Sequence, residues 1–129
     1  LPTEAEWEWA ARGGVQSLGY TYSGSNTVGD VAWYAGNNTP SGTKVVGTKA
    51  GNEVGLYDMS GNVREWCEDG YQATASSTQE AVNGNSPTYR VLRGGSWYDN
   101  SDYVRSSNRN SVTPGNTGSS IGFRVARTP

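Results

Sequence analysis

The feature that most limits how this chain can fold is the density of glycine and small polar residues. The 129 residues include 18 glycines, and Gly, Asn, Ser and Thr interrupt the apolar stretches every few positions. After about residue 12, no apolar repeat of 3.6 residues extends over a useful length. The sequence therefore predicts a loop-rich domain with short strands, preceded by one helix.

The first residues carry the clearest local signal, a capping box at Thr3 and Glu6. The Thr3 hydroxyl can accept the backbone N–H of Glu6, while the Glu6 carboxylate reaches back to the Thr3 N–H. Arg12 followed by Gly13–Gly14 supplies a positive charge at the helix end and then a stop. We predict a helix over residues 4 to 12.

Short apolar runs predict the strands, and long polar segments separate them. The two longest loops are 69–89 and 98–120. Compact domains seldom keep loops of that length without a function, and residues 98–120 are the ones that most need an explanation. The length fits one domain over residues 1–129. The predicted strands are 31–34, 44–47, 63–66, 90–93 and 123–126.

Composition removes several classes of function. The chain has no His, which excludes Ser-His-Asp triads, Cys-His pairs and His-bound metals. Cys67 is the only cysteine, so no intrachain disulfide forms. A net charge of −2 gives no basic field for nucleic acid, and no apolar run approaches the roughly 20 residues of a membrane span. The five tryptophans are expected in the core, since aliphatic residues are few: Trp7, Trp9, Trp33, Trp66 and Trp97.

Four motifs occur in order along the chain: LPTEAEWEWAARGG at 1–14, GLYDMSGNVREW at 55–66, RGGSW at 93–97 and GFR at 122–124. Together they resemble the formylglycine-generating-enzyme-type domain of the sulfatase-modifying factors, a branch of the C-type lectin fold. The resemblance implies an α+β domain, loop-rich, with short antiparallel strands and one or two helices. The family normally has strands before the first motif, so we expect the N-terminal part of the family domain to be absent from this sequence.

The chemistry of the enzymatic members is not expected here. They use a cysteine pair shortly after the Arg-Gly-Gly-Ser motif to bind copper and oxidise a substrate cysteine, and the resemblance places Asp99 and Val104 at those two positions. Neither residue supplies a thiolate. A related branch uses a His-bound iron, and this chain has no His. Cys67 is expected to be a small packed residue beside Trp66. We predict no enzymatic activity and no required cofactor.

A second resemblance concerns residues 90–126, which are similar to the variable region of proteins diversified by retroelements. In that group a reverse transcriptase randomises template adenines, which turns Asn codons into many others. The constant flanks would be 90–97 and 121–126. Randomising the first two bases of an Asn codon cannot produce Lys, Glu, Gln, Met or Trp. Residues 98–120 contain none of these, whereas the other 106 residues contain 18, so about four would be expected by chance.

Residues 98–120 have the composition of an antibody-like binding surface. Tyr98 and Tyr103 are the expected anchors, because tyrosine gives large contact area, while Ser, Gly and Asn give adaptable hydrogen bonds. The alternative is a polar loop that merely closes the fold, since turn chemistry favours the same residues. The predicted ligand-binding residues are Tyr98, Asp99, Asn100, Asp102, Tyr103, Asn110, Ser111, Val112, Thr113, Asn116, Gly118, Ser119 and Ser120.

The family resemblance also implies a calcium site. Asp58, Gly61, Val63 and Glu65 fall where the family's enzymes place calcium, with side-chain and backbone oxygens as hard ligands. The alternative is that Asp58 and Glu65 cap a turn and pair with Arg64 or Arg93. A tight turn at Ser60-Gly61-Asn62 is expected in either case.

The functional expectation is a non-enzymatic, receptor-type variable protein that displays residues 98–120 on a stable scaffold. Its partner would be a protein or surface ligand, not nucleic acid, and it would be displayed on a cell envelope or phage particle. The main alternative is a formylglycine-generating-enzyme-family domain with an accessory or oxidoreductase-related role that lacks the catalytic cysteines. An enzyme with its catalytic groups on a preceding segment and a sugar-binding lectin are further alternatives.

Overall fold

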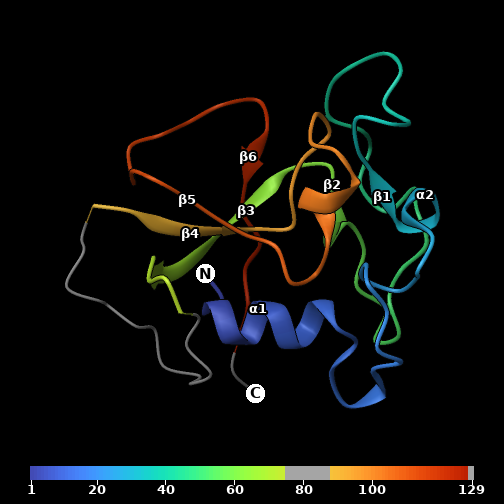
Figure 1. The fold of residues 1–129 in the computed structure, drawn as a ribbon, viewed down its shortest axis with the longest axis horizontal. Coiled ribbons are helices and arrows are strands. Elements are labelled where there is room, and N and C mark those ends of the chain that lie inside the picture. The colour runs from blue at the N-terminus through green and yellow to red at the C-terminus, as the bar shows by residue number, and fades with distance from the viewer. Residues whose placement is uncertain (75–87, 128–129) are drawn as a thin grey trace.

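The computed structural model describes residues 1–74 and 88–127, which form one main helix packed against a small sheet among long loops (Figure 1). The longest helix described has eight residues, far fewer than the roughly 20 that cross a bilayer. The helices are α1 (Glu4–Ala11) and α2 (Val28–Val31), with single 3-10 turns at Gly14–Gln16 and Ser101–Val104. The strands are β1 (Ala32–Trp33), β2 (Ser60–Gly61), β3 (Arg64–Gly70), β4 (Arg90–Arg93), β5 (Arg109–Val112) and β6 (Ile121–Gly122).

The capping box at the start of α1 is confirmed. The Glu6 N–H donates to Thr3 Oγ1 at 3.2 Å, and the Thr3 N–H donates to Glu6 Oε2 at 2.8 Å. The helix ends at Ala11, one residue before the predicted end, and Gly13 follows with a left-handed φ of 90°. Local sequence chemistry thus sets both ends of α1.

The main sheet has the strand order β5-β4-β3-β6. β4 pairs antiparallel with both β3 and β5, whereas the short β6 pairs parallel with β3. α1 lies across one face of this sheet (Figure 1). The core between them contains Trp7 and Ala11 of α1 together with Met59, Cys67 and Val91. Cys67 is a small buried core residue, as predicted.

Three of the five predicted strands have counterparts. Residues 90–93 coincide with β4, 63–66 overlap β3, and 31–34 contain β1. Residues 44–47 are not a strand: Val45 and Val46 are exposed. The Gly47 N–H there donates to Asp58 Oδ2 at 2.7 Å instead of to a neighbouring strand.

Two further strand boundaries differ from prediction. Residues 123–126 are not a strand: β6 ends at Gly122, just before this segment. β5 lies inside the segment predicted to be a loop, 98–120. Its sequence, Arg-Asn-Ser-Val, has no alternation of apolar and polar residues. The strand therefore depends on its pairing with β4 rather than on local propensity. Of the other predicted loop, 69–89, residues 69 and 70 belong to β3, and residues 75–87 lie outside the described residues.

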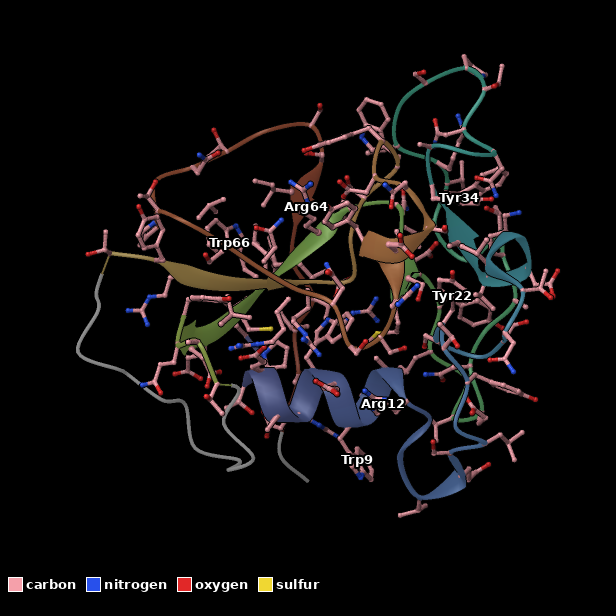
Figure 2. All side chains as sticks on the ribbon, in the orientation of Figure 1. Trp9, Arg12, Tyr22, Tyr34, Arg64 and Trp66 are labelled. Carbon is pink, nitrogen blue, oxygen red and sulfur yellow. The ribbon has the colours of Figure 1, made fainter. Side chains whose placement is uncertain are left out.

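The expectation that all five tryptophans are core residues is confirmed for Trp7 and wrong for Trp9. Trp7 is 1% exposed, whereas Trp9 is 58% exposed and points away from the sheet (Figure 2). The two lie two positions apart on α1, so they face opposite sides of the helix. Trp33, Trp66 and Trp97 are half-buried.

Candidate functional site

Residues 98–120 form a closed loop whose two ends meet over β3. The Arg64 N–H donates to the Ser120 carbonyl at 2.8 Å. The Trp97 indole Nε1 donates to the Ser119 carbonyl at 3.2 Å. At the entry, Gly95 has a φ of 68°, and a Cβ there would lie 2.5 Å from the Tyr103 carbonyl oxygen. Only glycine permits that close approach, which explains the Gly-Gly pair just before the segment.

Buried residues anchor the middle of the segment to the scaffold. Val104 and Ser106 are fully buried, and the Ser106 carbonyl accepts a hydrogen bond from Arg93 Nη2 at 2.9 Å. Arg109 Nε lies 2.6 Å from Glu4 Oε1 on α1. These contacts hold the segment against the core at points between its exposed stretches.

Most of the predicted ligand-binding residues face solvent. Tyr98 is 48% exposed and Tyr103 is 50% exposed. Asn110, Ser111 and Val112 are half-buried on β5. The exposed members of the predicted set number eight of thirteen: Tyr98, Asn100, Asp102, Tyr103, Thr113, Asn116, Gly118 and Ser119.

Asp99 and Ser120 are exceptions, because both are buried. The Asp99 carboxylate accepts hydrogen bonds from Arg64 Nε at 3.1 Å and Arg64 Nη2 at 2.6 Å. It also accepts from the Ser96 N–H at 2.8 Å and the Ser96 hydroxyl at 2.7 Å. Its prediction as a surface contact is therefore wrong: Asp99 is committed to holding the loop.

Asn62, predicted only as part of a tight turn, joins three segments around the site. Its N–H donates to the Trp33 carbonyl at 2.8 Å, and its carbonyl accepts from the Trp97 N–H at 2.9 Å. Its side chain bonds both the N–H and the carbonyl of Lys44. Asn62 has a left-handed φ of 64°, which fits the predicted Ser-Gly-Asn turn. The turn chemistry was visible in the sequence, but the three distant partners were not.

Comparison with known proteins shows to which family the chain belongs. The model of the sulfatase-modifying factor enzyme 1-like domain matches residues 1–129. The chain belongs to that family.

Individual family members are similar over nearly the whole of this chain. Treponema denticola variable protein 1, a solved structure, is 42% identical with a TM-score of 0.82, over 95% of this chain and 45% of that one. The chaperone protein LppX of Paenibacillus barcinonensis is 38% identical over 98% of this chain and 48% of that protein. The formylglycine-generating enzyme of Streptomyces coelicolor is 35% identical over 98% of this chain and 46% of that protein.

The fold is the formylglycine-generating-enzyme-type C-type lectin fold, as the motifs implied. The chain spans between about a fifth and about half of the length of the curated relatives that it matches. The relatives carry several different names, which include a chaperone and an enzyme. Family membership therefore leaves the activity of this member to be argued from its own residues.

The copper chemistry of the family's enzymes does not fit the residues found here. Asp99 and Val104, at the two expected ligand positions, are an ion-paired carboxylate and a fully buried apolar side chain. The one thiol, Cys67, lies in the core. Its burial raises the pKa of the thiol well above the ordinary value, so the thiolate needed to bind a soft metal does not form.

The two carboxylates of the predicted calcium site, Asp58 and Glu65, both accept hydrogen bonds from the protein. Both Glu65 carboxylate oxygens face donors: Oε2 accepts from the Trp7 indole at 2.7 Å, and Arg124 bonds Oε2 at 2.7 Å and Oε1 at 2.8 Å. Asp58 Oδ2 accepts from the Gly47 N–H. The alternative pairing of Glu65 with Arg64 or Arg93 is wrong: Glu65 pairs with Arg124, whereas Arg64 pairs with Asp99, and Arg93 with Glu4 and Glu8.

Proposed function

We propose that this chain is a non-enzymatic ligand-binding domain in which residues 98–120 form a variable surface on a constant scaffold. One observation carries the proposal: the residues of this segment that hold the fold differ from those that face solvent. Asp99, Val104, Ser106 and Arg109 point inward or pair with the scaffold. The stretches between them expose tyrosine and small polar side chains.

This separation is what a diversified surface requires. Substitutions at exposed positions away from caps and cores usually shift stability by only about 0.5 kcal/mol, so such positions accept many residue types. The composition of residues 98–120 supports the same reading, since the five residue types that a mutated Asn codon cannot encode are absent from it. Similarity to a protein described as variable adds support.

The chemistry of the surface indicates how a partner is recognised. Its exposed charges, Asp102 and Arg105, form an ion pair with each other. Tyrosine rings and neutral amide, hydroxyl and backbone groups dominate the remainder. Such a surface binds by aromatic contact and adaptable hydrogen bonding rather than by charge. The expected partner is a protein or another neutral polar surface, and its binding should depend only weakly on salt.

Two matched libraries test the proposal. One randomises exposed positions, namely 98, 100, 102, 103, 113 and 116, and the other randomises the buried positions 99, 104 and 106 together with three core positions. Display with a protease challenge measures the fraction of folded members, and selection against a purified protein of neutral surface measures binding. Most members of the first library should fold and resist the protease, and selection from that library should yield binders. Most members of the second library should be unfolded and cleaved by the protease. Equal loss of folded members in both libraries would contradict the proposal.

The absence of enzymatic activity is tested separately. With copper, oxygen and a cysteine-containing peptide, the chain should form no peptide aldehyde, because no thiolate pair lies at the expected position. Iodoacetamide should leave Cys67 unmodified in the folded chain and modify it in urea, since the thiol is buried and its pKa is raised. Aldehyde formation above the level of a Cys67→Ser control would overturn this part of the proposal.

A further inference from the structure

Arg64, which lies outside residues 98–120, contacts Tyr98, the expected aromatic anchor of the proposed binding surface. Arg64 lies on β3 (Figure 2). It contacts both ends of residues 98–120. Its backbone N–H donates to the Ser120 carbonyl, while its guanidinium makes a bidentate bond to the Asp99 carboxylate. One residue therefore closes the loop through its main chain and through its side chain.

The same guanidinium supports the ring of Tyr98. The Arg64 Cζ lies 5.0 Å from the Tyr98 ring centroid, within cation–π range. The Trp97 ring meets Tyr98 edge to face, with centroids 5.4 Å apart and an interplanar angle of 78°. Tyr98 is still about half exposed, so the ring is supported by two neighbours while part of its surface faces solvent.

The supporting groups are themselves fixed. The Arg64 side chain is 15% exposed and the Asp99 side chain 8%, and Asp99 is held by Ser96 as well. The Trp97 indole is anchored to the Ser119 carbonyl and its backbone to Asn62. A planar guanidinium suits this position because it can fork onto a carboxylate while one face covers a ring, which an ammonium cannot do.

We infer that Arg64 is a positioning residue for ligand binding: it pre-organises the Tyr98 ring so that less side-chain freedom is lost when a partner binds. This inference rests on the proposed function, because it assigns a role within the same surface. Immobilising one side chain at an interface changes affinity by about two- to tenfold. Arg64 itself need not touch the partner.

A double-mutant cycle between Arg64 and Tyr98 tests the inference. The probe is a single-domain antibody selected on the folded chain, with binding that Tyr98→Ala weakens but does not abolish. Arg64→Lys keeps the positive charge beside Asp99 and removes the planar fork. It should speed dissociation about two- to tenfold in the Tyr98 and Tyr98→Phe backgrounds and less than about twofold in the Tyr98→Ala background. Arg12→Lys, at the residue that follows α1, is the matched control and should have no effect in any background.

Equal losses for Arg64→Lys with Tyr98 and with Tyr98→Ala would show a general structural role and overturn the inference, as would no loss in either. Thermal unfolding checks that each variant is folded. If Arg64→Lys does not fold, the pair Arg64→Gln with Asp99→Asn removes both buried charges, and the same dependence on Tyr98 is expected. The antibody needs neither diversification nor a natural ligand, so this cycle and the library experiment can fail independently.

Discussion

Arg109 on β5 forms a two-bond ion pair with Glu4, the first residue of α1. Arg109 Nε lies 2.6 Å from Glu4 Oε1, and Nη2 lies 2.9 Å from Oε2. The buried Arg93 also reaches Glu4 Oε1, at 3.3 Å. A carboxylate near the start of the chain thus binds two arginines of the segment that resembles a variable region. The scaffold and the proposed display segment are coupled at this point.

Glu4→Gln should therefore be strongly destabilising. The change removes the only carboxylate that Arg109 contacts among the described residues and leaves the buried Arg93 with Glu8 as its one ion-pair partner. Breaking a buried ion pair from one side costs about 3 to 5 kcal/mol. Urea unfolding measures the change. Glu68→Gln, at an exposed position on β3, is the control and should shift stability by about 0.5 kcal/mol or less. A cost below about 1 kcal/mol for Glu4→Gln would show that the pair contributes little.

Glu8 should make stability depend on acid pH. Burial opposes its ionisation, but Arg93 and Arg12 outweigh that effect, so the pKa of Glu8 lies below its ordinary value of 4.5. Because the folded pKa is depressed, the ionised group stabilises the fold above the unfolded pKa, and this contribution is lost as pH falls through the folded pKa. Urea midpoints of the wild type should fall below about pH 4.5, and more steeply than those of Glu8→Gln. Parallel profiles for the two proteins would exclude Glu8 as the cause.

Two aspartates three positions apart should differ strongly in how much the same substitution destabilises the fold. Asp99→Asn removes the charge that Arg64 requires in a largely buried setting, and the expected cost is about 3 to 5 kcal/mol. Asp102→Asn alters an exposed pair with Arg105, for which the expected cost is about 0.2 to 1 kcal/mol. Thermal unfolding of the two variants under one buffer makes the comparison. If Asp99→Asn is as mild as Asp102→Asn, then residue 99 belongs with the displayed positions after all.

The two tryptophans of α1 provide a similar contrast. Trp7→Ala removes a buried ring and its 2.7 Å hydrogen bond to Glu65, and the expected cost is about 3 to 5 kcal/mol. Trp9→Ala removes a mostly exposed ring and should cost less than about 1 kcal/mol. Denaturant midpoints measure both. Comparable losses would mean that the outer face of α1 is more important for folding than its exposure indicates.

These contrasts mark what could be predicted from the sequence. The start and end of α1 and the left-handed Ser-Gly-Asn turn depend on residues within a few positions of one another, and both predictions are confirmed. β4 was found because a short apolar run is visible on its own. The family was predicted from four motifs that occur in order along the chain, and the family model confirms it over residues 1–129.

The features that could not be predicted depend on distant partners. Asp99 looks like any polar loop residue until Arg64, 35 positions earlier, is placed beside it. β5 has no strand pattern of its own and forms because β4 lies next to it. The prediction for Trp9 failed because residue type alone does not say which side of α1 faces the sheet. Composition could indicate a binding segment over residues 98–120, but not which of its members anchor it.

Sequencing the genomic locus in several isolates tests whether exposed residues of 98–120 vary on a constant scaffold. A near-copy of the DNA that encodes residues 90–126 is expected beside a reverse-transcriptase gene, with differences mainly at adenines. Differences between isolates should fall at exposed positions such as Tyr98, Tyr103 and Asn116, and should spare Asp99, Val104 and Ser106. No such copy in any isolate, or differences concentrated at the buried anchors, would contradict the proposal.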